Sequence, residues 1–114
     1  MNREVLEHYV EYFNNQEGRK YPCSNQIVLC RIITDDRNKA FEFMKDKEFA
    51  EIRERYNQID WVLTNGERWQ WRKWNERCRG YRFYKVAIDE HINDEVFHVL
   101  MKPCCEYCCS MEII

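Results

Sequence analysis

Apolar and polar residues alternate through the C-terminal segment, and this pattern constrains the fold more than any other. The apolar positions are Phe97, Val99, Met101, Cys105, Tyr107, Cys109, Met111 and Ile113. Because successive side chains of a strand point to opposite faces, a period of two predicts a half-buried β ribbon. Pro103 interrupts the pattern. Since proline cannot donate to a strand ladder, we expect two strands or a bulge there.

The N-terminal third predicts one helix followed by one strand. Residues 3–15 place apolar side chains at the spacing of one helical face, namely Leu6, Tyr9, Val10 and Phe13. Residues 26–33 form a short apolar run rich in branched side chains, which favours a buried strand.

Residues 35–59 are expected to form one or two central helices. Thr34 stands where an N-cap belongs, and Asp35 and Asp36 would complement the positive end of the helix dipole. Phe41 and Met44 would share one side of the first turns. A second helical spacing follows, formed by Phe49, Ile52, Tyr56 and Ile59.

The dipeptide Asn65-Gly66 indicates a hairpin turn, because both central positions of such a turn need a positive φ. Alternating residues flank it, although Gly66 could instead end a long helix. Residues 81–88 carry apolar groups on both faces and predict a central strand. The expected fold is therefore a single α+β domain over residues 1–114. It has an N-terminal helix, one buried strand, one or two central helices, and an antiparallel sheet or hairpin region in the C-terminal half.

Composition and charge support a folded domain with one basic segment. Aromatic residues make up 15%, with only 3 Gly and 2 Pro, which excludes a low-complexity chain. The net charge is −2. Between positions 67 and 85, however, seven basic residues face only Glu67 and Glu76, so this segment carries a positive surplus. The remaining chain is acidic, so any polyanion-binding role must come from one face.

This basic, tryptophan-rich segment is the candidate contact surface. Arginine binds carboxylate or phosphate bidentately, and tryptophan and arginine are enriched at protein–protein hot spots. The predicted partner-binding residues are Arg68, Trp69, Trp71, Arg72, Lys73, Trp74, Arg77, Arg79 and Arg82. The alternative is that Trp69 and Trp71 fill the core while the arginines face water. Acidic neighbours such as Glu48, Glu51 and Glu54 could then offset the charge.

Seven cysteines and no apolar leader predict free thiols and a cytoplasmic chain without a membrane span. Cys105 and Cys108 have the C-x2-C spacing of a zinc knuckle. No second such pair exists, so the further ligands would have to come from Cys23, Cys30, Cys78, His91 and His98. The preferred interpretation of residues 104–109 is a strand in which cysteine acts as a small hydrophobe, with no cofactor.

Catalytic templates are not matched in the sequence. Ser24 and Ser110 lack the glycine-flanked turn of a nucleophile elbow, and Cys78 lacks a partnering base. His91 and His98 fit no single-helix metal pattern and are interpreted as surface residues.

The expected function is therefore a non-enzymatic binding protein that docks its basic surface on an acidic macromolecule. It would act as an inhibitor or recruiter, for example a phage- or virus-encoded inhibitor of a host defence system. The alternatives are single-stranded nucleic-acid binding by the same residues and a zinc-stabilised interaction module.

Overall fold

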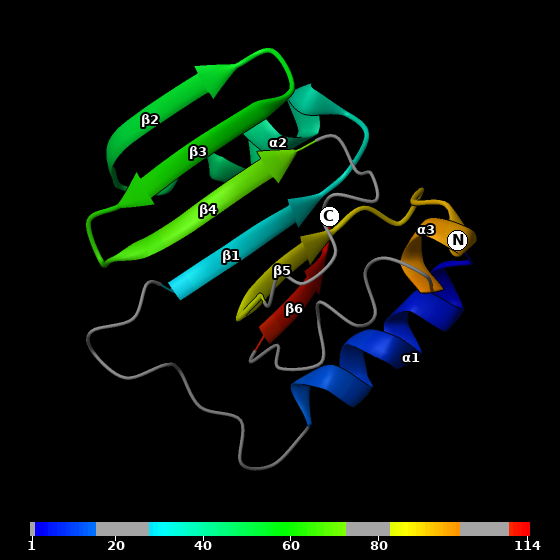
Figure 1. The fold of residues 1–114 in the computed structure, drawn as a ribbon. Helices are drawn as coiled ribbons and strands as arrows, with labels where there is room; N and C mark the ends of the chain where they lie inside the picture. Colours follow the sequence, from blue (N-terminus) through cyan, green and yellow to red (C-terminus); the bar gives the residue numbers. More distant parts are fainter. Residues whose placement is uncertain (1, 16–27, 73–82, 99–109) are drawn as a thin grey trace.

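A six-stranded mixed sheet organises the chain in the computed structural model, which describes residues 2–15, 28–72, 83–98 and 110–114 (Figure 1). The strand order is β2-β3-β4-β1-β5-β6. The β1–β4, β1–β5 and β5–β6 pairs are parallel, whereas β2–β3 and β3–β4 are antiparallel. The strands are β1 (Val28–Ile33), β2 (Phe49–Arg55), β3 (Gln58–Leu63), β4 (Glu67–Arg72), β5 (Lys85–Ile88) and β6 (Ser110–Ile113).

Helices cover the two faces of this sheet at different places. They are α1 (Arg3–Asn14), α2 (Arg37–Met44) and the short α3 (Asp94–Val96). Asn2 caps α1, since its Oδ1 accepts a hydrogen bond from the Glu4 backbone N–H at 2.8 Å. Figure 1 shows α2 behind strands β3 and β4 and α1 along β6. No helix within the described ranges is both long and apolar enough to cross a bilayer.

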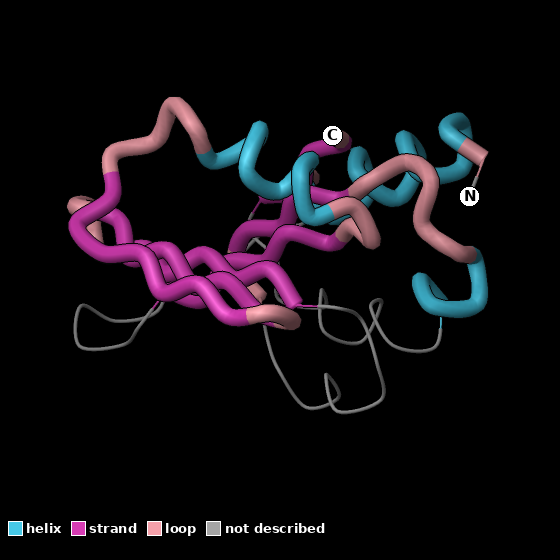
Figure 2. The backbone as a smooth tube through the Cα atoms, turned by 90° about the horizontal axis from the view of Figure 1, so that it is seen from above, coloured by secondary structure: helices cyan, strands magenta, loops and turns pink. Residues whose placement is uncertain are grey.

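Two apolar clusters hold the layers together. On the α2 side, Ala40 and Met44 pack against Cys30, Ile32, Ile59, Trp61, Leu63, Trp69, Trp71 and Ala87. Figure 2 shows α2 lying on one side of the strand layer. The second cluster joins α1 to the other part of the sheet and contains Leu6, Phe13, Ile33, Phe83, Val86, Ile88, Ile92, Phe97 and Met111.

Strand β1 is buried on both faces, as expected for the centre of a parallel region. Cys30 and Ile32 point toward α2, while Ile33 joins the α1 cluster. Arg31 is also fully buried, with its guanidinium 5.1 Å from the centre of the Phe83 ring. The prediction of a buried strand over 26–33 is confirmed for residues 28–33, as is the N-terminal helix.

The predicted central helices were largely wrong. Only Arg37–Met44 is helical, and residues 49–59 form β2 and the start of β3. The helix is capped by Asp36, whose side chain accepts from the backbone N–H groups of Asn38 and Lys39, and not by Thr34. The molecule is strand-dominated because a hairpin occupies the place of the second predicted helix.

The predicted antiparallel arrangement of the C-terminal half was wrong beyond the β3–β4 hairpin. β5 and β6 run parallel to each other and to β1. Of the predicted ribbon over 97–113, Phe97 follows α3 and Ser110–Ile113 forms β6, while residues 99–109 lie outside the described part. Apolar–polar alternation reports a half-buried strand but does not specify the direction of its neighbour.

The predicted hairpin at Asn65-Gly66 is confirmed between β3 and β4, but the expected positive φ at both positions is wrong, because Gly66 has one and Asn65 does not. Gly66 has φ +91°, and its backbone N–H donates to the Leu63 carbonyl at 3.1 Å. The Asn65 side chain accepts from the Glu67 N–H at 3.0 Å, which fixes the entry to β4.

Replacing Gly66 with alanine is expected to lower the free energy of unfolding by about 1–2 kcal/mol. An added Cβ would meet nothing within 4 Å, so the cost comes only from the positive φ. Gly66→Asn should cost less, because asparagine tolerates left-handed backbone. Urea denaturation measures both variants. Equal stability of Gly66→Ala and the unchanged chain would contradict this turn geometry.

Candidate functional site: an arginine face on the sheet

The alternation in β4 sends tryptophans to one face and arginines to the other. Trp69 and Trp71 are 2% and 5% exposed and belong to the α2 cluster. Trp69 Nε1 donates to Glu67 at 3.1 Å, and Trp71 Nε1 donates to the Thr34 carbonyl at 2.9 Å. Both indoles are therefore satisfied core groups and offer no stacking face to a partner.

The opposite face of the same strands is rich in arginine, with the apolar Leu29 and Val62 on either side of Arg68. Strand register places Arg53 beside Asp60, Asp60 beside Gln70, and Gln70 beside Arg31. A neighbouring row joins Arg55, Gln58 and Arg72. We define the arginine face as the side of β1–β4 away from α2, formed by Arg31, Glu51, Arg53, Arg55, Gln58, Asp60, Arg68, Gln70 and Arg72.

Two carboxylates in the described part of this face lie close to its arginines. Arg53 Nε donates to Glu51 at 2.7 Å, and Arg68 Nη2 lies 3.8 Å from Asp60 Oδ1. Gln58 Nε2 donates to the other Asp60 oxygen at 2.9 Å. Among the described residues this face holds five arginines and two carboxylates, and one of the arginines, Arg31, is fully buried.

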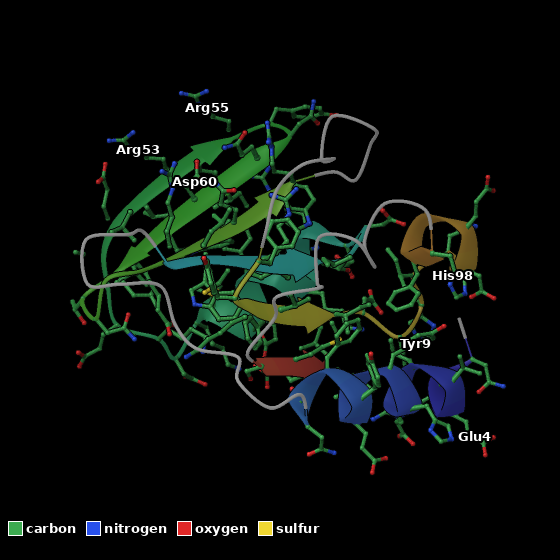
Figure 3. All side chains as sticks on the ribbon, turned by 60° about the horizontal axis from the view of Figure 1, so that its bottom comes forward. Glu4, Tyr9, Arg53, Arg55, Asp60 and His98 are labelled. Atoms are coloured by element: carbon green, nitrogen blue, oxygen red, sulfur yellow. The ribbon has the colours of Figure 1, made fainter. Side chains whose placement is uncertain are left out.

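The arginines differ in how far they reach solvent. The side chain of Arg53 is 64% exposed and that of Arg68 is 37% exposed. Arg55 is exposed, and within the described ranges its guanidinium forms no hydrogen bond or ion pair. Figure 3 shows Arg53 and Arg55 extending from the sheet edge, with Asp60 beside them. The accessible positive charge is therefore concentrated at the β2 end of the face.

The structure divides the predicted contact residues into three groups. Arg68 and Arg72 lie on the arginine face, and Trp69 and Trp71 lie in the core. The others, Lys73, Trp74, Arg77, Arg79 and Arg82, fall outside the described residues. Arg53 and Arg55 were missed because their segment was assigned to a helix. No local signal would have found them, because β2 is exposed on both faces and its residues show no apolar–polar alternation.

A second polar cluster lies at the carboxyl ends of β1 and β5, where parallel sheets often bind ligands. Asp89 accepts from the Thr34 hydroxyl at 2.6 Å, from Lys39 Nζ at 3.0 Å and from the His91 backbone N–H at 2.9 Å. Burial raises the pKa of Asp89, but these hydrogen bonds and the Lys39 charge outweigh it and lower the pKa. Because these groups satisfy one another, we assign the cluster to stability.

The predicted metal candidates receive little structural description. Cys30 is buried, while Cys23, Cys78 and residues 104–109 lie outside the described ranges, so the zinc alternative stays a prediction. His91 is exposed beside Glu90, and His98 packs edge-on against Tyr9. Within the described residues, no group of three metal-ligating side chains comes together.

No family model, curated protein or solved structure matches this chain.

Proposed function

We propose that this chain is a non-enzymatic binding protein that docks its arginine face on the acidic surface of a macromolecular partner. The observation that carries the proposal is the alignment of the exposed Arg53 and Arg55 of β2 with Arg68 of β4 on one side of the sheet, where the described carboxylates are Glu51 and Asp60. Arginine is suited to this role because its planar fork binds carboxylates bidentately and it stays charged at all working pH values.

The sheet gives these guanidinium groups a fixed spacing. Neighbouring strands lie about 4.8 Å apart, and alternate residues of one strand about 7 Å apart. Arg53 and Arg55 are alternate residues of β2, so their Cα atoms keep the longer of these separations. A rigid array of this kind suits a partner that presents several carboxylates on a fixed surface. Such docking can block or recruit the partner, which is how an inhibitor acts.

The contact proposed here is charged and not aromatic. Three of the four tryptophans, Trp61, Trp69 and Trp71, are buried in the core, which weakens the case for base stacking on single strands. A charged contact should associate quickly, because exposed charges steer the encounter, and its affinity should fall as the salt concentration rises, because ions screen those charges.

Reversing Arg53 and Arg55 together to glutamate is expected to lower affinity for the native partner by about a hundredfold. Like charges would then face the partner's carboxylates, while the core stays intact because both side chains are exposed. Tagged chain captures the partner from nuclease-treated extract of the native cell. Titration of that partner then measures the loss.

The matched control reverses Arg3 and Lys45, which are also exposed and lie on α1 and at the end of α2. This double variant has the same net charge as Arg53→Glu/Arg55→Glu. The surface ion pairs that it loses contribute little to stability. It should bind like the unchanged chain. An equal loss of affinity in both double variants would show that only net charge matters and would contradict the proposed surface. Retained binding by Arg53→Glu/Arg55→Glu would overturn the proposal. Capture that nuclease abolishes would instead favour nucleic acid.

A further inference from the structure

Strand β2 forms one edge of the sheet and is exposed along its whole length. Phe49 and Ile52 are 43% and 40% exposed although both point to the α2 side. An edge strand offers unpaired backbone groups to another strand, and natural proteins usually protect it with charges or a bulge. β2 has both, since charged residues follow a bulge between Phe49 and Glu51.

In the part of β2 that follows the bulge, Glu51–Arg55, the charges leave only one self-pairing without like charges opposite each other. When a twofold axis pairs two antiparallel copies of a strand, one residue lies opposite itself. Centring on any charged residue of this part puts like charges directly opposite each other, which is destabilising; these residues are Glu51, Arg53, Glu54 and Arg55. Centring on Ile52 pairs Ile52 with itself and pairs Glu51 of each copy with Arg53 of the other.

We propose that this chain forms a homodimer in which the β2 strands of two copies pair antiparallel about Ile52. Two opposite-charge pairs, Glu51 with Arg53 and the reverse, flank an apolar Ile52 contact. The Arg53–Glu51 hydrogen bond at 2.7 Å within one copy shows that these two side chains lie on the same face of the edge strand β2. In the dimer these two pairs would form a cluster of four charges, two from each copy, on the same face of the joined strands.

The geometry of this pairing has a consequence for the arginine face. A twofold axis centred on Ile52 runs perpendicular to the sheet, so the same face of the sheet points in the same direction in both copies. The sheet would continue across the dimer, and the two arginine faces would form one surface, with the α2 helices together on the other. The dimer does not depend on the proposed acidic partner.

Charge reversal at one position should break the dimer. In Glu51→Arg, the introduced arginine faces Arg53 of the other copy, and in Arg53→Glu, the introduced glutamate faces Glu51. Each variant repels itself twice, so the dimer dissociation constant should rise by about tenfold or more. Sedimentation velocity from micromolar to millimolar protein measures it, and thermal melting verifies that each variant is folded.

Mixing the two single variants should restore association, because one then carries two positive charges and the other two negative charges at the paired positions. The double variant Glu51→Arg/Arg53→Glu should also dimerise by itself. A monomer at every concentration for the unchanged chain, or a dimer that both single reversals leave intact, would overturn the inference. Glu51→Arg also separates the two proposals, since it removes the dimer yet adds positive charge to the arginine face.

Discussion

Replacing Trp71 with alanine is expected to lower the free energy of unfolding by about 3–5 kcal/mol, the usual cost of removing a large core aromatic. The indole is 5% exposed and packs in the α2 cluster. Its loss also leaves the Thr34 carbonyl without the Nε1–H donor that lies 2.9 Å away. Urea denaturation followed by circular dichroism measures the change.

Trp71→Phe serves as the matched variant, because it keeps an aromatic ring but removes the donor. It should cost clearly less than Trp71→Ala. A near-normal unfolding free energy for Trp71→Ala, combined with lost partner binding, would place this indole on the contact surface and contradict its assignment to the core.

Replacing Asp89 with asparagine is expected to lower the free energy of unfolding by about 2–3 kcal/mol at neutral pH, because charged hydrogen bonds are lost. The carboxylate is 8% exposed and is paired with Lys39, which is 29% exposed. An amide cannot supply the negative charge that holds Lys39 Nζ and Thr34 together at the ends of β1 and β5. Denaturation at pH 7 measures the difference.

The same variant should reduce the acid sensitivity of the fold. The pKa of Asp89 is lower in the folded chain than in the unfolded chain, so its stabilisation is fully present above the unfolded pKa of about 4. It is lost as the pH falls through the folded pKa. The stability gap between Asp89→Asn and the unchanged chain should therefore narrow in acid.

The exposed Asp35 provides the control, since Asp35→Asn should leave the free energy of unfolding at pH 7 unchanged. The free energy of unfolding should stay somewhat acid-sensitive in every variant because of Glu67. Burial raises the pKa of Glu67, but contacts with Lys85 and Trp69 outweigh this and lower it. A gap between Asp89→Asn and the unchanged chain that stays constant from neutral to acid pH would contradict this account.

The error over residues 49–59 has a physical cause. A half-buried strand is recognised by alternation, but β2 is exposed on both faces and shows none. Its apolar residues happen to recur at helical spacing. The turn to β3 gives no warning either, because Tyr56 and Asn57 form it without glycine and without a positive φ.

The direction of the strands could not be predicted from local patterns. The strand β1, its burial and the Gly66 hairpin follow from residue types within a few positions of each other. The parallel pairing of Val28–Ile33 with β4 and β5 joins residues tens of positions apart, and apolar runs fit either direction. Burial on both faces of β1 is the feature that distinguishes this parallel region.

The sequence predicted some residues of the arginine face but not others, because strand pairing joins residues that lie far apart in the chain. The alternation of Arg68, Trp69 and Trp71 was visible in the sequence, and the alternative that placed the indoles inside is the one that the structure supports. Arg53 and Arg55 join that face only through the register of β2 with β3, which a helix assignment hides.

Arginine modification in the bound and free states tests the arginine face most directly. A dicarbonyl reagent labels accessible guanidinium groups, and mass spectrometry of peptides gives the extent of labelling at each residue. We predict that the captured partner protects Arg53 and Arg55 while Arg3 on α1 is labelled equally in both states. Equal labelling of Arg53 and Arg55 with and without the partner would contradict the account.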